Sequence, residues 1–239
     1  MTMNNPMRIV KLEAVPISFP VPENKSVRLG IGKCVKRDSV LVRIETEDGH
    51  IGWGEAHHGR APGAIAKLID TTMRELVLNQ DAMDINGIWA RVYKMQISSH
   101  GMGAAAVLAL SGIDIALWDI IGKSCGKPIH KLIGGSYRSE VTPYATGLYF
   151  IDMNRLIEEA VEEALEFKGS GFTAIKMKIG LGDLKFDIKR VEAVRKAVGD
   201  EMRLMVDANH CFTVPQAIQI GRELEKLQIE WFEEPISPE

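Results

Sequence analysis

Apolar and polar residues alternate over the first part of the chain, which is the pattern of strands with one buried face. We predict strands over residues 8–19, 39–46 and 51–54. Asp48-Gly49, which precedes the third of these, is a typical hairpin turn pair. Residues 20–36 contain Pro, Gly and several basic residues and are expected to form a long loop. Together these segments predict an antiparallel sheet.

From residue 61 the apolar positions recur at helical spacing. We predict a helix over residues 61–77, a second helix that begins near Asp84 as its N-cap, and a third over 103–123. The third is apolar almost all round, so we expect it in the middle of a helical bundle. Strands followed by helices predict an α+β domain over residues 1–138.

After Gly134-Gly135-Ser136 the pattern changes to short apolar runs that alternate with amphipathic helices. Such alternation predicts a parallel α/β sheet, and we assign residues 139–239 to this second domain. The strands are expected at 141–145, 174–179, 204–207 and 230–232, and the helices at 152–167, 185–198 and 214–227.

The composition is that of a folded globular chain, with 46% hydrophobic and 26% charged residues among 239. A net charge of −3 offers no general attraction for nucleic acid or an anionic membrane. The three cysteines contain no C-x-x-C pair, so neither a disulfide framework nor a zinc knuckle is predicted. We therefore expect no nucleic-acid partner and a reducing compartment.

The sequence also bears on membrane association. The N-terminus has no apolar stretch of signal-peptide length. The most apolar run, residues 104–121, is interrupted by Asp114 and Asp119, so we interpret it as a buried helix and not as a membrane span. We expect a cytoplasmic protein without a membrane partner.

Charged residues mark the ends of the predicted parallel strands. Lys176 and Lys178 close the second strand, Asp207 the third, and Glu233 and Glu234 the fourth. The intervals, 29 residues from Lys178 to Asp207 and 26 from Asp207 to Glu233, are close to the roughly 31 residues per unit of a 250-residue, eightfold barrel. Because α/β folds bind ligands at the carboxyl ends of strands, we expect these groups to meet at the top of a barrel.

These residue types indicate a particular chemistry. Lys176 and Lys178 share one strand face, and their mutual repulsion is expected to lower the pKa of at least one of them, toward that of a base. Asp207 and Glu233 are oxygen donors one strand apart, which suits Mg²⁺. A lysine base that faces such a cation favours abstraction of a proton next to a carboxylate, with the cation stabilising the resulting enediolate.

Each group also has an ordinary structural interpretation. A single K-x-K is typical of a solvated strand edge, and Asp207 after a strand is typical of a helix N-cap. Glu-Glu-Pro is common at helix starts. The coincidence of three such groups at the spacing of barrel units favours the functional interpretation.

Several short motifs follow one another in a specific order: Gly52-Trp53-Gly54-Glu55-Ala56, residues 109–119, Leu132-Ile133-Gly134-Gly135, Lys176-Met177-Lys178, Asp207-Ala208-Asn209 and Trp231-Phe232-Glu233-Glu234-Pro235. In this order they resemble the enolase superfamily, specifically its mandelate racemase and muconate lactonizing enzyme branch. The resemblance covers nearly the whole chain. It implies an α+β capping domain followed by a TIM-type, enolase-like α/β barrel.

The resemblance also implies roles for the charged residues. Lys178 is implied as the base, with Lys176 beside it tuning its pKa and facing the substrate carboxylate. Asp207 and Glu233 are implied as the first two of three Mg²⁺ ligands. Glu234 is expected to be a structural partner behind the ligands, because adjacent strand residues point to opposite sides.

Further residues are expected near the substrate. Asn209 lies on the same face as Asp207 and is a candidate hydrogen-bond partner of substrate, whereas His210 is either a substrate contact or a loop histidine. The segment Tyr144-Ala145-Thr146-Gly147 resembles the corresponding segment of enzymes that act on sugar acids. Tyr144 and Thr146 are therefore candidate substrate contacts.

In the family the loops of the capping domain close over the barrel mouth. This places residues 20–36 together with His57, His58 and Arg60 at the substrate end. Solvated loop residues are the competing interpretation for these three side chains.

The reaction implied by the resemblance is that of a sugar-acid dehydratase, a hydro-lyase, or of a sugar-lactone cycloisomerase, as in galactarolactone cycloisomerase-like proteins. The alternative in the same superfamily is a racemase or epimerase of a 2-hydroxy acid. The expected partner is a small carboxylate, a sugar acid or lactone, and the resemblance implies a homo-oligomer. Which acid is bound and which of these reactions follows stay open.

An eightfold barrel has twice the strands predicted for residues 139–239, so we expect only its first half, ending after the fourth strand. The third metal ligand and a second acid or base are then implied beyond residue 239. The alternative to an enzyme is a truncated, catalytically incompetent fragment that only binds partners or assembles through its capping domain.

Overall fold

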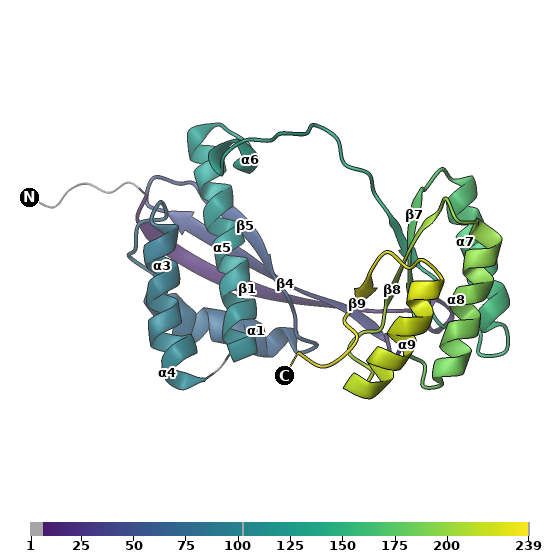
Figure 1. Ribbon diagram of the computed structural model, residues 1–239. Helices are drawn as coiled ribbons and strands as arrows, with labels where there is room; N and C mark the ends of the chain where they lie inside the picture. Colours follow the sequence, from purple (N-terminus) through teal and green to yellow (C-terminus); the bar gives the residue numbers. More distant parts are fainter. Residues whose placement is uncertain (1–6, 102, 239) are drawn as a thin grey trace, which may run out of the picture. The chain divides into compact units, whose positions relative to one another are not determined.

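The computed structural model describes residues 7–101 and 103–238 (Figure 1). Contacts divide the chain into two units, one formed by Met1–Pro20 and Lys36–Ser139 and the other by Val21–Val35 and Glu140–Glu239. Each unit has its own core of buried apolar residues.

The sheet of the first unit is antiparallel, as the alternating pattern predicted. It consists of β1 (Ile9–Pro20), β4 (Lys36–Thr46) and β5 (Ile51–Ala56), in the order β1-β4-β5. Every second side chain of β4 from Val40 onward is buried, because that face of the sheet lies against helices.

Helices cover the buried face of this sheet. Asp84 is the N-cap of α3, as predicted, and its side chain accepts a hydrogen bond from the Gly87 amide at 2.9 Å. The helix expected over residues 61–77 is interrupted in its middle by a π-helical segment, η2. The segments are α1 (Pro62–Leu68), η2 (Ile69–Met73), α2 (Arg74–Val77), α3 (Ile85–Val92), η3 (Tyr93–Ile97), α4 (Ser98–His100), α5 (Gly103–Cys125) and α6 (Ile129–Leu132).

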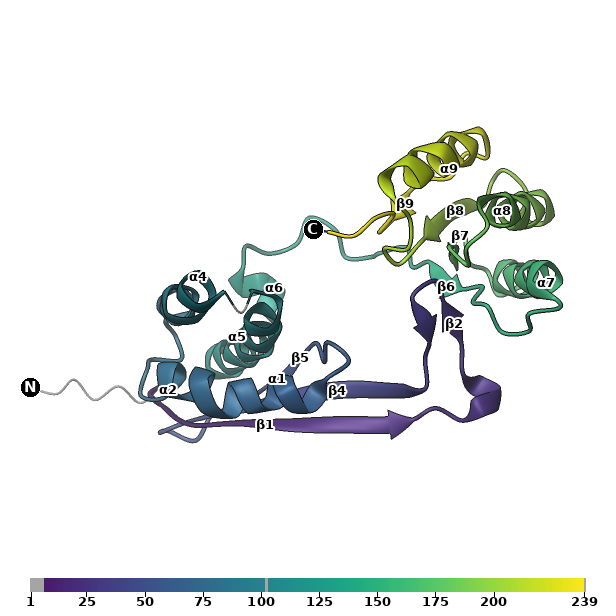
Figure 2. The same ribbon diagram turned by 90° about the horizontal axis from the view of Figure 1, so that it is seen from below.

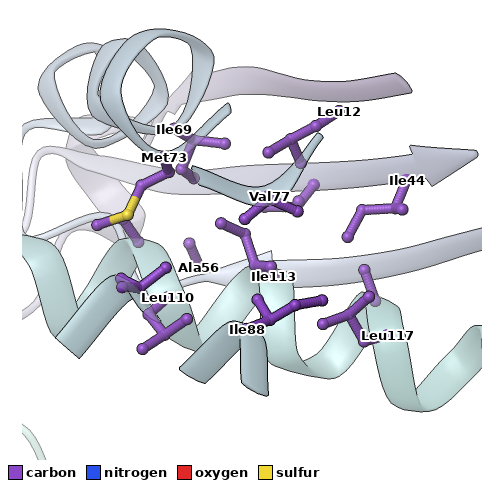
Figure 3. Close-up of a cluster of buried hydrophobic side chains, with 14 of the residues drawn as sticks. Leu12, Ile44, Ala56, Ile69, Met73, Val77, Ile88, Leu110, Ile113 and Leu117 are labelled. Carbon is purple, nitrogen blue, oxygen red and sulfur yellow. The ribbon is translucent and has the colours of Figure 1, made fainter. Parts of the chain in front are cut away.

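Helix α5 is the central element of this core (Figure 3). By length and composition alone it is apolar enough to cross a membrane, but half of its most apolar stretch is buried inside the structure. Leu110, Ile113 and Leu117 of α5 pack among side chains from the sheet and the shorter helices.

Glycines allow α5 to approach β5 closely. A Cβ on Gly54 would lie 2.1 Å from the carbonyl oxygen of Gly112 and 2.8 Å from the Ala116 amide nitrogen. A Cβ on Gly52 would lie 2.1 Å from the Ala116 carbonyl oxygen. Backbone atoms of a central helix cannot move away cheaply, so the glycines of the Gly-Trp-Gly motif have a packing role.

The second unit contains a parallel sheet in the order β6-β7-β8-β9. Its strands are β6 (Ala145–Gly147), β7 (Ala174–Lys178), β8 (Arg203–Asp207) and β9 (Phe232–Glu233). Helices α7 (Leu156–Gly169), α8 (Leu184–Val198) and α9 (Val214–Lys226) lie along one face of it (Figure 2). The predicted fold class, an α+β capping domain followed by the parallel strand and helix units of an α/β barrel, is confirmed.

The segment expected to be a long loop contains structure of its own. It forms a short 3₁₀ turn, η1 (Glu23–Lys25), and a small hairpin of β2 (Arg28–Leu29) and β3 (Gly32–Lys33). The Arg28 amide of β2 donates to the Phe150 carbonyl at 3.0 Å. Figure 2 shows β2 close to β6. Although strands of the first unit flank Val21–Val35 in sequence, its contacts place it with the second unit.

We predict that Gly54→Ala destabilises the protein by about 3 kcal/mol, because the new methyl group meets main-chain atoms of α5. The control is Gly63→Ala in α1, where a Cβ meets nothing within 4 Å and the change should stabilise the helix by about 0.5–1 kcal/mol. Urea unfolding measures both. Equal stabilities of Gly54→Ala and wild type would contradict the close approach.

Candidate functional site

Two lysines and two carboxylates meet at the carboxyl ends of the parallel strands. The strand register places Lys178 opposite Asp207, and Asp207 opposite Glu233. The Lys178 Nζ lies 2.5 Å from Asp207 Oδ2, and the Lys176 Nζ lies 2.6 Å from Glu233 Oε2 and 3.9 Å from Asp207 Oδ2. We call these four residues the strand-end cluster.

The strand-end cluster is largely withdrawn from water. Lys176 and Lys178 are each 8% exposed and Asp207 is 2% exposed. Burial lowers the pKa of Lys176, but its hydrogen bond to Glu233 and the charges of Glu233 and Asp207 outweigh burial, so its pKa is raised. For Lys176 the carboxylates therefore outweigh the expected repulsion between the lysines.

The donor set of the cluster fits a magnesium ion. Asp207 and Glu233 are hard oxygen donors on neighbouring strands, and Mg²⁺ keeps several waters and binds through one or two carboxylates. Within residues 7–101 and 103–238 no group of three or more His, Cys, Asp or Glu side chains forms a complete metal site. The two carboxylates can therefore supply part of a coordination sphere, and in this structure the lysine ammonium groups are their counter-ions.

The loops after β8 and β9 are tied together by Asn209, His210 and Glu234. The Asn209 amide donates to Asp207 Oδ1 at 2.9 Å, and Asn209 Nδ2 donates to Glu234 Oε2 at 3.1 Å. His210 Nε2 lies 3.2 Å from Glu234 Oε1. All three residues have positive φ angles, 47°, 63° and 45°, an unusual backbone conformation for residues other than glycine. Glu234 thus holds Asn209 and His210, the second and third residues after Asp207.

Aromatic rings border the cluster on both sides. The Tyr144 ring packs edge-on against Trp231, and its centroid lies 5.5 Å from the Lys176 Nζ. Trp231 Nε1 donates to Glu233 Oε2 at 3.2 Å. The Tyr149 ring centroid lies 5.8 Å from the Lys178 Nζ. Tyr144 is a contact predicted from the sequence, whereas Tyr149 and Trp231 are not, although an aromatic residue next to a strand end that carries a lysine is a usable signal.

The hairpin of the 21–35 segment reaches the same strand ends. A Cβ on Gly30 would lie 2.7 Å from the Gly180 carbonyl oxygen and 3.3 Å from Cys211 Sγ, so only glycine fits there. Gly180 follows β7 and Cys211 follows β8. Thr146, another predicted contact, is exposed and lies opposite Lys176 in the strand register.

His57, His58 and Arg60 belong to the first unit. The two imidazole rings stack with centroids 4.5 Å apart, and the Arg60 amide donates to His58 Nδ1 at 2.8 Å. Burial and the neighbouring His57 lower the pKa of His58. That these three side chains contact substrate stays a prediction.

Helix α8 carries two fully buried charged residues that are not among the site residues predicted from the sequence, Asp187 and Arg190. Asp187 Oδ2 accepts a hydrogen bond from the Gly180 amide at 3.0 Å. Burial raises the pKa of Asp187 to about 6 and lowers the pKa of Arg190 to about 10. A usable signal existed, because both residues fall on the stripe of α8 that also contains Val191, Val194 and Val198.

Two family profiles match the chain. The profile described as "Mandelate racemase / muconate lactonizing enzyme, N-terminal domain" matches residues 13–134. The profile described as "Enolase C-terminal domain-like" matches residues 157–239.

The names of similar curated proteins refer to sugar acids or lactones. The chain is 41% identical over 197 residues to an arabinonate dehydratase from Saccharolobus solfataricus, covering 82% of this chain and 52% of that protein. It is 41% identical over 204 residues to a D-galactarolactone cycloisomerase from Agrobacterium fabrum, covering 85% and 53%. The chain thus spans about half the length of the curated relatives it matches.

Solved structures share the fold. An enolase superfamily member from Polaromonas sp. JS666 superposes with a TM-score of 0.89 at 43% identity, covering 97% of this chain and 60% of that one. A racemase from Streptomyces coelicolor A3(2) with bound magnesium superposes with a TM-score of 0.84 at 36% identity, covering 97% and 63%.

We predict that Asp187→Asn stabilises the protein more at pH 7.5 than at pH 4.5. The folded pKa of Asp187, about 6, lies above the ordinary value of 3.8, so ionisation costs the wild type stability as the pH rises through this interval. Asparagine keeps an acceptor for Gly180 and cannot ionise. The difference in unfolding free energy between variant and wild type should grow by on the order of 2–3 kcal/mol from pH 4.5 to 7.5.

Thermal unfolding of both proteins across this pH range measures the difference. Asp183→Asn, an exposed N-cap on the same helix, is the control and should show no comparable growth. A constant difference between Asp187→Asn and wild type at all pH values would contradict the assignment.

Proposed function

Because the chain belongs to the mandelate racemase / muconate lactonizing enzyme family of the enolase superfamily, we propose that the protein catalyses Mg²⁺-dependent removal of the proton next to a carboxylate in a sugar acid or sugar lactone. The proposed outcomes are dehydration or cycloisomerisation. The observation that carries this proposal is the strand-end cluster, in which two nearly buried lysines face two carboxylates at hydrogen-bond distance.

In this proposal Lys178 is the base. Its Nζ ends in the cluster next to Asp207, and in its neutral form it accepts the proton from the carbon beside the substrate carboxylate. Lys176, on the same strand face, presents its ammonium group to that carboxylate. Asp207 and Glu233 would hold Mg²⁺, which supplies positive charge that stabilises the enediolate.

The substrate class is proposed from the relatives. Arabinonate dehydratase and D-galactarolactone cycloisomerase both carry sugar-derived substrates in their names, and both are 41% identical to this chain. Candidate contacts to the sugar hydroxyls are Asn209, Tyr144 and Thr146 beside the cluster, with His210, His57, His58 and Arg60 proposed on the family pattern. A second candidate, racemisation of a 2-hydroxy acid, is favoured by the likeness to the racemase with bound magnesium.

We predict that Lys178→Ala slows exchange of the α-proton of a sugar acid by about 10²–10⁴-fold, because the proton acceptor is removed. The measurement is the loss of the α-proton NMR signal in D₂O with Mg²⁺, for a panel that includes arabinonate, galactarate and galactonate. Lys185→Ala, an exposed lysine on α8, is the matched control and should exchange like wild type. Equal exchange rates for Lys178→Ala and wild type would remove Lys178 from the role of base.

We predict that Asp207→Asn abolishes stabilisation by Mg²⁺. For wild type, Mg²⁺ at ten times its Kd should add about 1.4 kcal/mol, which raises the melting temperature by roughly 3–6 °C. Glu230→Gln is the control, since Glu230 is exposed, pairs with Arg203 at the other end of β8 and should retain the Mg²⁺ effect. If Mg²⁺ raised the melting temperature of Asp207→Asn as much as that of wild type, the assignment of Asp207 as a metal ligand would be contradicted.

A further inference from the structure

Arg190 of α8 is fully buried, and its guanidinium group donates hydrogen bonds to main-chain carbonyls. Its Nη1 donates to the Lys178 carbonyl at 2.6 Å, and its Nε donates to the Leu156 carbonyl at 2.9 Å. Its Nη2 donates to the carbonyls of Leu148 at 2.6 Å and Tyr149 at 3.3 Å. One guanidinium group therefore joins the end of β7, the loop after β6 and the start of α7.

If Arg190 served only the stability of the fold, burying its charge would be an unfavourable way to achieve it, because removing the charge from water costs free energy. Burial lowers the pKa of the guanidinium because it disfavours the charged form, and apolar side chains of similar volume can often replace buried ion pairs without loss of stability. An apolar side chain, however, has no N–H groups and cannot donate hydrogen bonds to several carbonyls at once. The rigid fork of an arginine has donors at fixed angles, so it defines the relative positions of the segments that it joins.

Two of these hydrogen bonds lead directly to Lys178. The first fixes the carbonyl of Lys178 itself, and with it the direction in which the side chain leaves the strand. The second fixes the main chain of Tyr149, whose ring lies 5.8 Å from the Lys178 Nζ. Asp187, one turn earlier on α8, holds the Gly180 amide just beyond the same strand.

The same helix provides a comparison. Arg195 is also buried and also donates to carbonyls, those of Leu227, Gly199, Met202 and Gln228. These carbonyls lie in the loops that precede β8 and follow α9, at the amino ends of the strands. In α/β barrels that end contributes stability, whereas the carboxyl end carries the site.

We propose that Arg190 is a positioning residue for Lys178, acting through the Lys178 carbonyl and the Tyr149 loop to hold the Lys178 amine against Asp207. The consequence for catalysis rests on the proposed function, in which Lys178 is the base. The positioning itself rests on the contacts of Arg190 and has a readout that requires no turnover.

The test is amine labelling of the folded protein at one fixed pH, followed by peptide mass spectrometry. The variants are Arg190→Lys and Arg190→Gln, with Arg195→Lys and Arg195→Gln as matched controls, all at a temperature below the lowest melting point. Lys176 is the internal reference, because it lies on the same strand and the carbonyls that Arg190 holds belong to other residues, Lys178, Leu148, Tyr149 and Leu156.

We expect the labelling rate of Lys178 relative to Lys176 to rise at least threefold in the Arg190 variants and to stay unchanged in the Arg195 variants. In the exchange assay, Arg190→Lys should lower kcat at least tenfold with little change in KM. An unchanged ratio, or the same change in both sets, would overturn the proposal. Failure of both Arg190 variants to fold would also overturn it, since Arg190 would then serve the fold as a whole.

The experiments distinguish failure of the positioning role of Arg190 from failure of the proposed function. If the Lys178 to Lys176 ratio rises in the Arg190 variants but wild type exchanges no α-proton with any acid, the positioning role stands and the proposed function is contradicted. If wild type exchanges and Arg190→Lys exchanges equally well with an unchanged labelling ratio, the proposed function stands and the positioning role is contradicted.

Discussion

The pairing of two lysines with two carboxylates across β7, β8 and β9 is the interaction on which the site depends. Lys178 and Asp207 are both nearly buried, so each needs the other's charge. Removing one member of a buried ion pair typically costs about 3–5 kcal/mol, because the remaining charge is left without compensation. The same dependence brings the Lys178 amine, the proposed base, within 2.5 Å of a carboxylate oxygen of Asp207, the proposed metal ligand.

This pairing requires a precise strand register, and the surrounding structure supplies it. Asp207 and Glu233 are opposite each other only because β8 and β9 pair in parallel at their last residues. Behind the sheet, Arg190 and Asp187 of α8 hold the end of β7 and the loop that follows it. In the loops after β8 and β9, Glu234 contacts Asn209 and His210, which have positive φ angles and follow Asp207 closely in the chain. Contacts of side chains with the main chain and with one another thus hold the segments that carry the charges.

The 21–35 segment shows how a connection between two strands of one unit serves another. Its hairpin pairs with Phe150 and its Gly30 lies against Gly180 and Cys211, where a side chain would collide with main chain. The flanking strands β1 and β4 nevertheless remain paired with each other along their whole length. The segment is therefore a structured contribution to the surroundings of the strand-end cluster and not a free loop.

The sequence by itself indicated most of the elements and the residues of the cluster, but not the hairpin of β2 and β3, the π-helical η2 or the bounds of β6, which is Ala145–Gly147 and not 141–145. Alternation, helical spacing and charges at strand ends are local patterns, so Lys176, Lys178, Asp207 and Glu233 could be assigned to one edge of a parallel sheet without coordinates. Tertiary structure decided which lysine meets which carboxylate, where Gly30 lies, and why α8 buries Arg190. These depend on contacts between residues far apart in the chain, such as Arg190 with Leu148, which no periodicity records.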